Sequence, residues 1–169
     1  MFEIKGYVFY GTEGICRVDD IVAAPFSGID PDVKYYVLHS THGGSNTSFV
    51  PVEGAESLMR RIMSEAELTT FIGKISSLTL FEEEPLKQMK EKYNLALRSG
   101  DPLEWMRVIK TVNTRMLDGR GGGKKVSDAE VAISNNAKRY LYKEISIVLG
   151  VPEENVEKYI CDNVVETAV

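Results

Sequence analysis

The first third of the chain alternates short apolar runs with turn residues, whereas the remainder shows a helical period. The short runs are rich in valine and aromatic residues, and they occupy residues 7–10, 14–19, 34–39, 47–52 and 58–63. Five such strands, joined by hairpins, predict a small SH3- or Tudor-like β-barrel over residues 1–62. Apolar residues at helical spacing predict an all-α bundle of about five helices over residues 63–169. The expected fold class is therefore α+β.

Start and stop signals define the expected helices. Ser64 with Glu67, and Ser127 with Glu130, have the S-x-x-E spacing of a capping box, which opens a helix. Gly150 follows a long periodic segment and is typical of a helix C-terminus. The expected helices span residues 64–76, 85–99, 102–117, 127–149 and 152–163, with a Gly-rich linker over residues 118–125.

Composition favours an ordinary globular protein over a disordered or membrane protein. Apolar residues make up 43% of the chain and charged residues 27%. No run approaches the roughly 20 apolar residues that a membrane helix needs. The N-terminus lacks the layout of a signal peptide, so the cytoplasm is the expected compartment. Cys16 and Cys161 are expected to be buried thiols and not a disulfide.

Charge is segregated along the chain, although the net charge is only -5. Residues 85–149 carry 13 Lys and Arg against 7 Asp and Glu, and the segments on either side are acidic. A basic segment between acidic ones indicates a local site for a polyanion. The alternative is that these residues form the ordinary solvated faces of Lys-rich helices.

Pro51 indicates where the sheet ends. Proline cannot donate to a strand ladder, so it belongs at the end of a strand or on a sheet edge. Thr47, Ser48, Phe49 and Val50 are therefore expected to form an edge strand with open hydrogen-bonding groups. Such an edge invites strand addition by a partner protein. An edge covered by a loop, without a partner, is the alternative.

The sequence contains no convincing catalytic or metal-binding pattern. His39 and His42 lack the spacing of a metal pair, and no Cys or carboxylate cluster completes a ligand set. Residues 119–125 resemble a phosphate loop only superficially, because Asp118 stands where the first Gly is required and Lys125 replaces the hydroxyl residue. We expect no metal, no cofactor, no small-molecule substrate and no enzymatic activity. An enzyme would require a pocket with convergent titratable groups.

The ordered series of motifs resembles the CarD/CdnL family of bacterial transcription regulators, whose N-terminal module is shared with the transcription-repair coupling factor. The resemblance spans nearly the whole chain. Its N-terminal elements are residues 7–10, 14–18, 35–38, 49–52 and 59–60. Its C-terminal elements are residues 99–101, Trp105, and residues 124–127, 142–144 and 149–152.

This resemblance implies a Tudor-like domain that extends a sheet of the RNA polymerase β subunit, using Thr47, Ser48, Phe49, Val50 and Pro51. It also implies a helical domain that contacts promoter DNA beside the melted region and stabilises the open complex, so that the protein associates with the nucleoid through polymerase. Salt-dependent phosphate contacts, indifferent to base sequence, are then expected from Lys87, Lys90, Lys92, Arg107, Lys110, Lys124 and Lys125. The alternative is an adaptor that binds polymerase without touching DNA.

The chain departs from the family pattern at three places. Lys5-Gly6 replaces the Gly-Asp before the first strand. Phe49 stands where some members carry Arg, so an apolar polymerase contact is expected in place of a charged one. Some members carry a Trp near the start of the second helix, as a wedge into the minor groove. This chain has no Trp at residues 86–88, and its single Trp, Trp105, lies at helical spacing with other apolar residues and is expected in the core.

Overall fold

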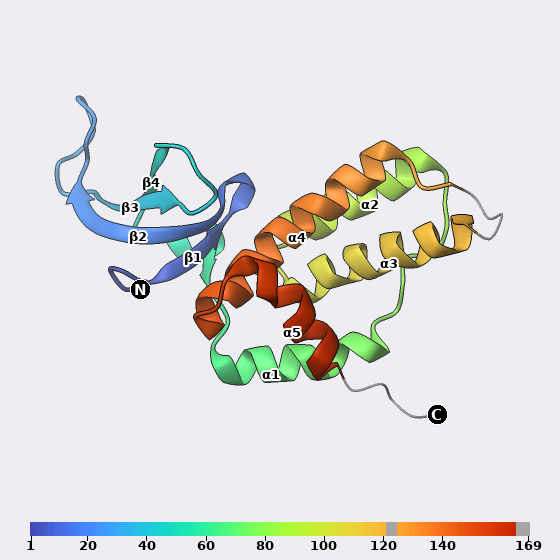
Figure 1. Ribbon diagram of the computed structural model, residues 1–169. Helices are drawn as coiled ribbons and strands as arrows, with labels where there is room; N and C mark the ends of the chain where they lie inside the picture. Colours follow the sequence, from blue (N-terminus) through green and yellow to red (C-terminus); the bar gives the residue numbers. More distant parts are fainter. Residues whose placement is uncertain (121–124, 165–169) are drawn as a thin grey trace. The chain divides into compact units, whose positions relative to one another are not determined.

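The computed structural model describes residues 1–120 and 125–164, and the chain divides into two units (Figure 1). The first unit, Met1–Ile62, contains all the described strands. The second begins at Met63 and is helical. The change from a two-residue to a helical period in the sequence therefore coincides with the change from sheet to helix. An α+β fold is confirmed.

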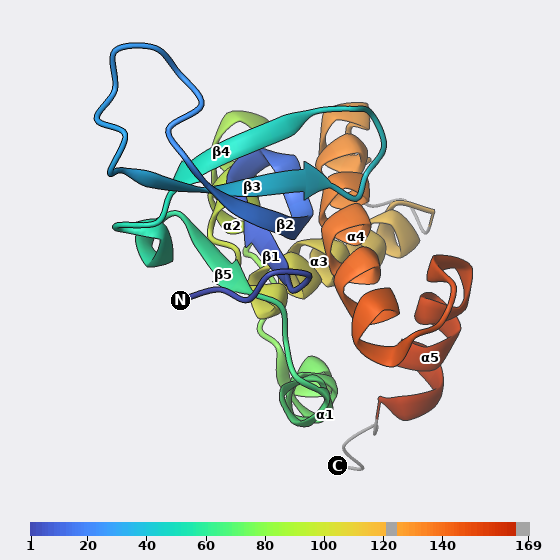
Figure 2. The ribbon, with the colours of Figure 1, turned by 90° about the vertical axis from the view of Figure 1, so that its left-hand side faces the viewer.

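Five antiparallel strands form one sheet in the order β4-β3-β2-β1-β5 (Figure 2). They are β1 (Tyr7–Tyr10), β2 (Gly14–Ala23), β3 (Lys34–Ser40), β4 (Thr47–Pro51) and β5 (Met59–Arg61). A 3₁₀ turn joins β1 to β2, and Gly11 and Gly14 at its ends both adopt positive φ, as glycine readily does. The described pairings leave β4 and β5 at the edges of an open sheet. Closure into a barrel therefore stays a prediction.

One face of the sheet carries the core of the first unit. Its members alternate along the strands, as the two-residue period requires. The residues of this core cluster are Val8, Cys16, Val18, Tyr36, Leu38, Val50, Ala55 and Met59. Phe9 and Ile15 are also buried but do not belong to this cluster. Burial raises the pKa of the Cys16 thiol to about 12, with a further contribution from Glu13, so this thiol stays protonated at neutral pH.

Five α-helices form the second unit, and α4 contacts each of the other four. They are α1 (Glu65–Lys74), α2 (Leu86–Arg98), α3 (Pro102–Arg120), α4 (Asp128–Leu149) and α5 (Val156–Asn163). Ser127 and Glu130 form the predicted reciprocal capping box at the start of α4, and Gly150 ends that helix in the left-handed conformation. Within the described ranges, none of the helices is long and apolar enough to cross a membrane.

Two expectations about this unit are wrong. First, α3 continues to Arg120, so residues 118–120 of the expected linker are helical. A glycine costs about 1 kcal/mol inside a helix, which is little against the packing of α3 on α4. Second, Cys161 is exposed, and like Cys16 it is a free thiol. Val156 and Ile160 form the buried stripe of α5, and Cys161 lies just outside it.

Trp105 lies in the core of the helical unit, as expected. Its side chain is fully buried, its ring packs against Tyr140 at 5.6 Å between centroids, and its indole N–H donates to the Leu97 carbonyl at 3.1 Å. The hydrogen bond satisfies the one polar group of the buried indole. Because the ring is fully buried, Trp105 does not supply a surface wedge.

Candidate protein-docking edge and nucleic-acid interface

Strand β4 lies at the edge of the sheet, which confirms the expectation drawn from Pro51. Val52 N–H donates to the Lys34 carbonyl at 2.9 Å, and Val50 lies opposite Tyr36 in the same register. Hydrogen-bonded and non-hydrogen-bonded pairs alternate in an antiparallel ladder. The backbone groups of Val50 therefore point toward β3, and those of its neighbours point away from it.

The outward-facing positions of β4 are Thr47, Phe49 and Pro51. The backbone nitrogen of Pro51 points away from β3, so the missing N–H removes no hydrogen bond between β3 and β4. Thr47 and Phe49 each present an N–H and a carbonyl there, and among the described residues β3 is the only strand that pairs with β4. The arrangement is a template for one further antiparallel or parallel strand.

The side chains of β4 divide between the two faces of the sheet. Val50 is buried in the core, whereas Ser48, Phe49 and Pro51 are half-buried and Thr47 is exposed. The five predicted docking residues therefore have different roles. Val50 holds the strand to its own domain, and the outward backbone at Thr47 and Phe49 is what a partner can reach.

Lys87 and Lys90 are the best-placed of the predicted phosphate-binding residues in the helical unit. Both are exposed on α2, where they line a hollow of about 350 Å³ together with Leu86, Glu91 and Asn94. Leu86, at the first position of the helix, is 46% exposed. This surface combines two exposed ammonium groups with an exposed apolar side chain and one carboxylate.

Lys92, Lys125 and Lys124 differ in their surroundings. Lys92 forms an ion pair with Glu84 at 2.9 Å, which partly neutralises its charge. Lys125 is exposed immediately before α4. Lys124 lies outside the described residues.

Arg107 and Lys110 make contacts inside the protein. The Arg107 guanidinium lies 3.8 Å from the Phe81 ring centroid, and its Nε donates to the Thr79 carbonyl at 2.8 Å. Lys110 Nζ donates to the carbonyls of Ile75 and Ser76 at 2.9 and 3.3 Å. These two cations fasten the segment after α1 to α3, so a phosphate group would compete with existing partners for them.

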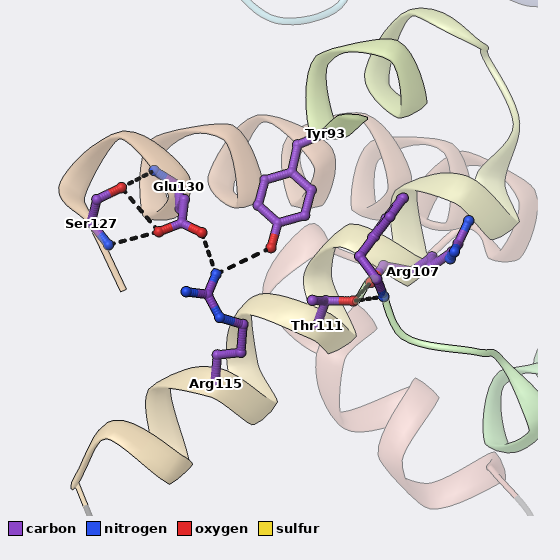
Figure 3. A network of polar contacts seen from close by, with 7 residues as sticks. Tyr93, Arg107, Thr111, Arg115, Ser127 and Glu130 are labelled. Atoms are coloured by element: carbon purple, nitrogen blue, oxygen red, sulfur yellow. Dashed lines mark hydrogen bonds and ion pairs between the residues drawn. The ribbon is translucent and has the colours of Figure 1, made fainter. Parts of the chain in front are cut away.

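A polar network, drawn in Figure 3, joins α2, α3 and α4. Arg115 of α3 forms an ion pair with Glu130 of α4 and donates to the Tyr93 hydroxyl of α2 at 3.4 Å. The Glu130 carboxylate also accepts from the Ser127 backbone N–H at 2.9 Å and from the Ser127 hydroxyl at 3.0 Å. Three helices are thus tied together at one point.

Two opposing influences act on the pKa of Glu130. Burial alone would raise it, but the hydrogen bonds from Ser127 and Arg115 outweigh burial and hold this pKa below its usual value. Burial raises the pKa of Tyr93, and the Arg115 contact opposes that shift. Glu130 is consequently ionised at neutral pH, as the ion pair requires.

The capping-box spacing predicted half of this network, and nothing in the sequence indicated the other half. Ser127 and Glu130 are three residues apart, so their contact is local. Arg115 and Tyr93 lie in other helices, and no local pattern distinguishes Arg115 from an exposed arginine. The network positions the helix segments that carry the exposed cations, since Lys90 lies one turn from Tyr93 and Lys125 two residues before Ser127.

The histidines lie in the first unit. His42 Nε2 accepts a hydrogen bond from the Ile15 backbone N–H at 3.2 Å, which holds the β3–β4 connection against β2. The Thr41 N–H and hydroxyl both donate to the Ile15 carbonyl in the same region. Across residues 1–120 and 125–164, no group of three His, Cys, Asp or Glu side chains is arranged to hold a metal ion.

Comparison with known protein families gives two matches that follow the two units. Residues 2–63 match the CarD-like/TRCF RID domain, and residues 80–161 match the CarD C-terminal domain. No curated protein matches the chain. The first domain is a module that interacts with RNA polymerase, which indicates a role in the regulation of transcription. The two domains occur in the order expected from the motifs and together cover most of the sequence, so the chain belongs to the CarD family.

Proposed function

We propose that this protein binds the β subunit of RNA polymerase through strand β4 and contacts promoter DNA through its helical unit, thereby modulating the stability of the open complex. In this proposal it acts by binding alone, without a cofactor, a small-molecule substrate or a catalytic step. The observation that carries the docking half is the open edge of β4 with the outward-facing backbone of Thr47 and Phe49.

Strand addition explains why this edge is suited to a protein partner. Main-chain hydrogen bonds to an added strand supply affinity, and the alternate side chains supply specificity. Natural proteins commonly protect exposed edges with charged residues. Strand β4 has the sequence Thr-Ser-Phe-Val-Pro and carries no such charge, and Pro51 blocks only the last outward-facing position, so Thr47 and Phe49 can receive a partner.

A pull-down with the isolated polymerase β subunit tests the docking half. Phe49→Asp places a charge beside the added strand and should abolish capture. Leu58→Asp is the matched control, because Leu58 is 53% exposed and lies next to β5 at the other edge of the sheet. Failure of the unmodified chain to bind the β subunit would refute this half, as would equal loss of capture in both variants.

The DNA half rests on the exposed cations at Lys87, Lys90 and Lys125. Each phosphate contact contributes about 0.9 to the slope of log affinity against log salt concentration. Lys87→Glu combined with Lys90→Glu should therefore lower the magnitude of that slope by about 2 on forked promoter DNA. The variant Lys74→Glu combined with Lys158→Glu has the same net charge and serves as the control. Equal slopes in the two variants would contradict a DNA contact on α2.

A second candidate is a polymerase-binding adaptor that does not touch DNA. It is favoured by the internal partners of Arg107 and Lys110 and by the Lys92–Glu84 ion pair, which reduce the number of available cations. An open-complex lifetime assay separates the two functions. The adaptor should leave the lifetime unchanged by charge reversal at Lys87 and Lys90, whereas the DNA-contacting regulator should lose its effect.

A further inference from the structure

An aromatic cluster lies on the outer face of the sheet, beside the open edge of β4. Phe26, from the connection between β2 and β3, contacts Phe49 edge-on, with ring centroids 5.6 Å apart and an interplanar angle of 79°. Its ring also meets Tyr35 edge-on at 6.3 Å and 88°. Phe26 remains 50% exposed, and Phe49 and Tyr35 are half-buried. Exposed aromatic surface therefore lies next to the outward-facing backbone of β4.

The strand register specifies where a partner side chain would lie. Tyr35 and Phe49 lie on the face opposite the core, because their neighbours Tyr36 and Val50 are buried. The N–H and carbonyl of Phe49 point outward, so an added strand would place one residue directly opposite Phe49. Directly opposed side chains share a face, with Cβ atoms about 4.5–5.5 Å apart. That partner side chain would lie against Phe49 on the aromatic face.

The chemistry of this face is apolar beside the open edge, whereas Arg17, Asp20 and His39 lie on the same face along β2 and β3. Strand β4 contains no charged residue, and the rings of Phe26 and Phe49 offer their edges and faces to a neighbouring side chain. Aromatic pairs contribute about 0.5–1.5 kcal/mol beyond the burial of their area, which favours an apolar or aromatic partner over a polar one.

We infer that the polymerase strand that pairs with β4 presents an apolar or aromatic side chain opposite Phe49, and that Phe26 completes its binding surface. Phe26 is thereby a specificity-determining residue that lies outside the docking strand itself. The inference rests on the proposed docking of β4 on polymerase. It adds a residue from the β2–β3 connection and a recognition chemistry that does not depend on ion pairs.

Binding of the full chain to RNA polymerase core enzyme, measured over a salt series, tests this inference. Phe26→Ser should weaken binding by about tenfold, which is more than truncation of most interface residues causes. Ile29→Ser is the matched control, because Ile29 is 41% exposed in the same connection, and it should change affinity by less than about twofold. The affinity of the unmodified chain should vary little with salt, because apolar contacts are not screened.

The outcomes distinguish this inference from the docking proposal. Binding that is unaffected by Phe26→Ser, or that is lost as salt is added, would overturn apolar recognition while leaving docking intact. No binding by the unmodified chain would refute docking and, with it, the inference. Circular dichroism verifies that Phe26→Ser is folded, which Phe26, 50% exposed in a connection, allows. The salt series on the unmodified chain tests the apolar recognition independently of that variant.

Discussion

Arg115→Met removes the cation that links three helices of the second unit. Methionine has a similar length and keeps the apolar packing of the side-chain stem, but it leaves Glu130 without its ion pair. The side chain of Arg115 is 14% exposed and that of Glu130 only 3% exposed, so solvent compensates little for the loss. The Tyr93 hydroxyl also loses the hydrogen bond from Arg115.

The expected loss in the free energy of unfolding depends on the hydrogen bonds that Glu130 keeps in the Arg115→Met variant. Breaking a buried ion pair by removing one partner costs about 3–5 kcal/mol, because a charge is left uncompensated. Here the Ser127 backbone N–H and hydroxyl still bind the Glu130 carboxylate, which places the expected cost near the lower value, about 3 kcal/mol. In a chain of this size that corresponds to a fall in Tm of about 6–12 °C.

Urea unfolding followed by circular dichroism at 222 nm, which is dominated by helix, measures this cost. Lys90→Met, at an exposed position of α2, is the control and should change the free energy of unfolding by less than about 0.5 kcal/mol. The double variant Arg115→Met with Glu130→Leu should be more stable than the sum of the single changes predicts, by about 1–3 kcal/mol. An Arg115→Met variant as stable as the control would refute the claim that the network holds the helices together.

Three further outcomes are expected. The helical unit should lose stability as the pH falls through the lowered pKa of Glu130, since that carboxylate stabilises the fold only when ionised. Glu130→Gln should remove the corresponding fall in Tm at acidic pH. Trp105→Ala should cost about 3–5 kcal/mol in urea unfolding, because it opens a cavity and leaves the Leu97 carbonyl without the indole N–H, and a cost below about 1 kcal/mol would contradict core packing. In the native protein Ellman's reagent should modify Cys161 alone, and Cys16 should react only on unfolding. Rapid reaction of both thiols would contradict the burial of Cys16.

The features that sequence predicts well are those set by near neighbours in the chain. The Ser127–Glu130 capping box is confirmed because its partners are one helical turn apart. The edge position of β4, which the strand order confirms, could be predicted because proline has no N–H in any fold. The core position of Trp105 follows from apolar residues at helical spacing, which need only the period of the helix itself.

The candidate site was predicted less completely, because charge along the sequence does not reveal which cations are available. Arg107 and Lys110 have the same residue types and spacing as surface cations, yet they bind carbonyls and an aromatic ring in the segment after α1. Cys161 differs from a buried thiol only by one position on α5. Phe26 lies in a connection without any periodic pattern, so nothing local indicated its contact with Phe49.

The division into sheet and helix, the helix caps and the edge position of β4 could be predicted from sequence, because these depend on backbone geometry and side-chain spacing over a few residues. Which charged groups neutralise one another, and which aromatic rings meet beside the edge, became known from the three-dimensional packing. Those contacts join residues such as Arg115 and Glu130, or Phe26 and Phe49, that are brought together by packing. Electrostatic and aromatic interactions fall off with distance in space, and separation along the chain does not specify that distance.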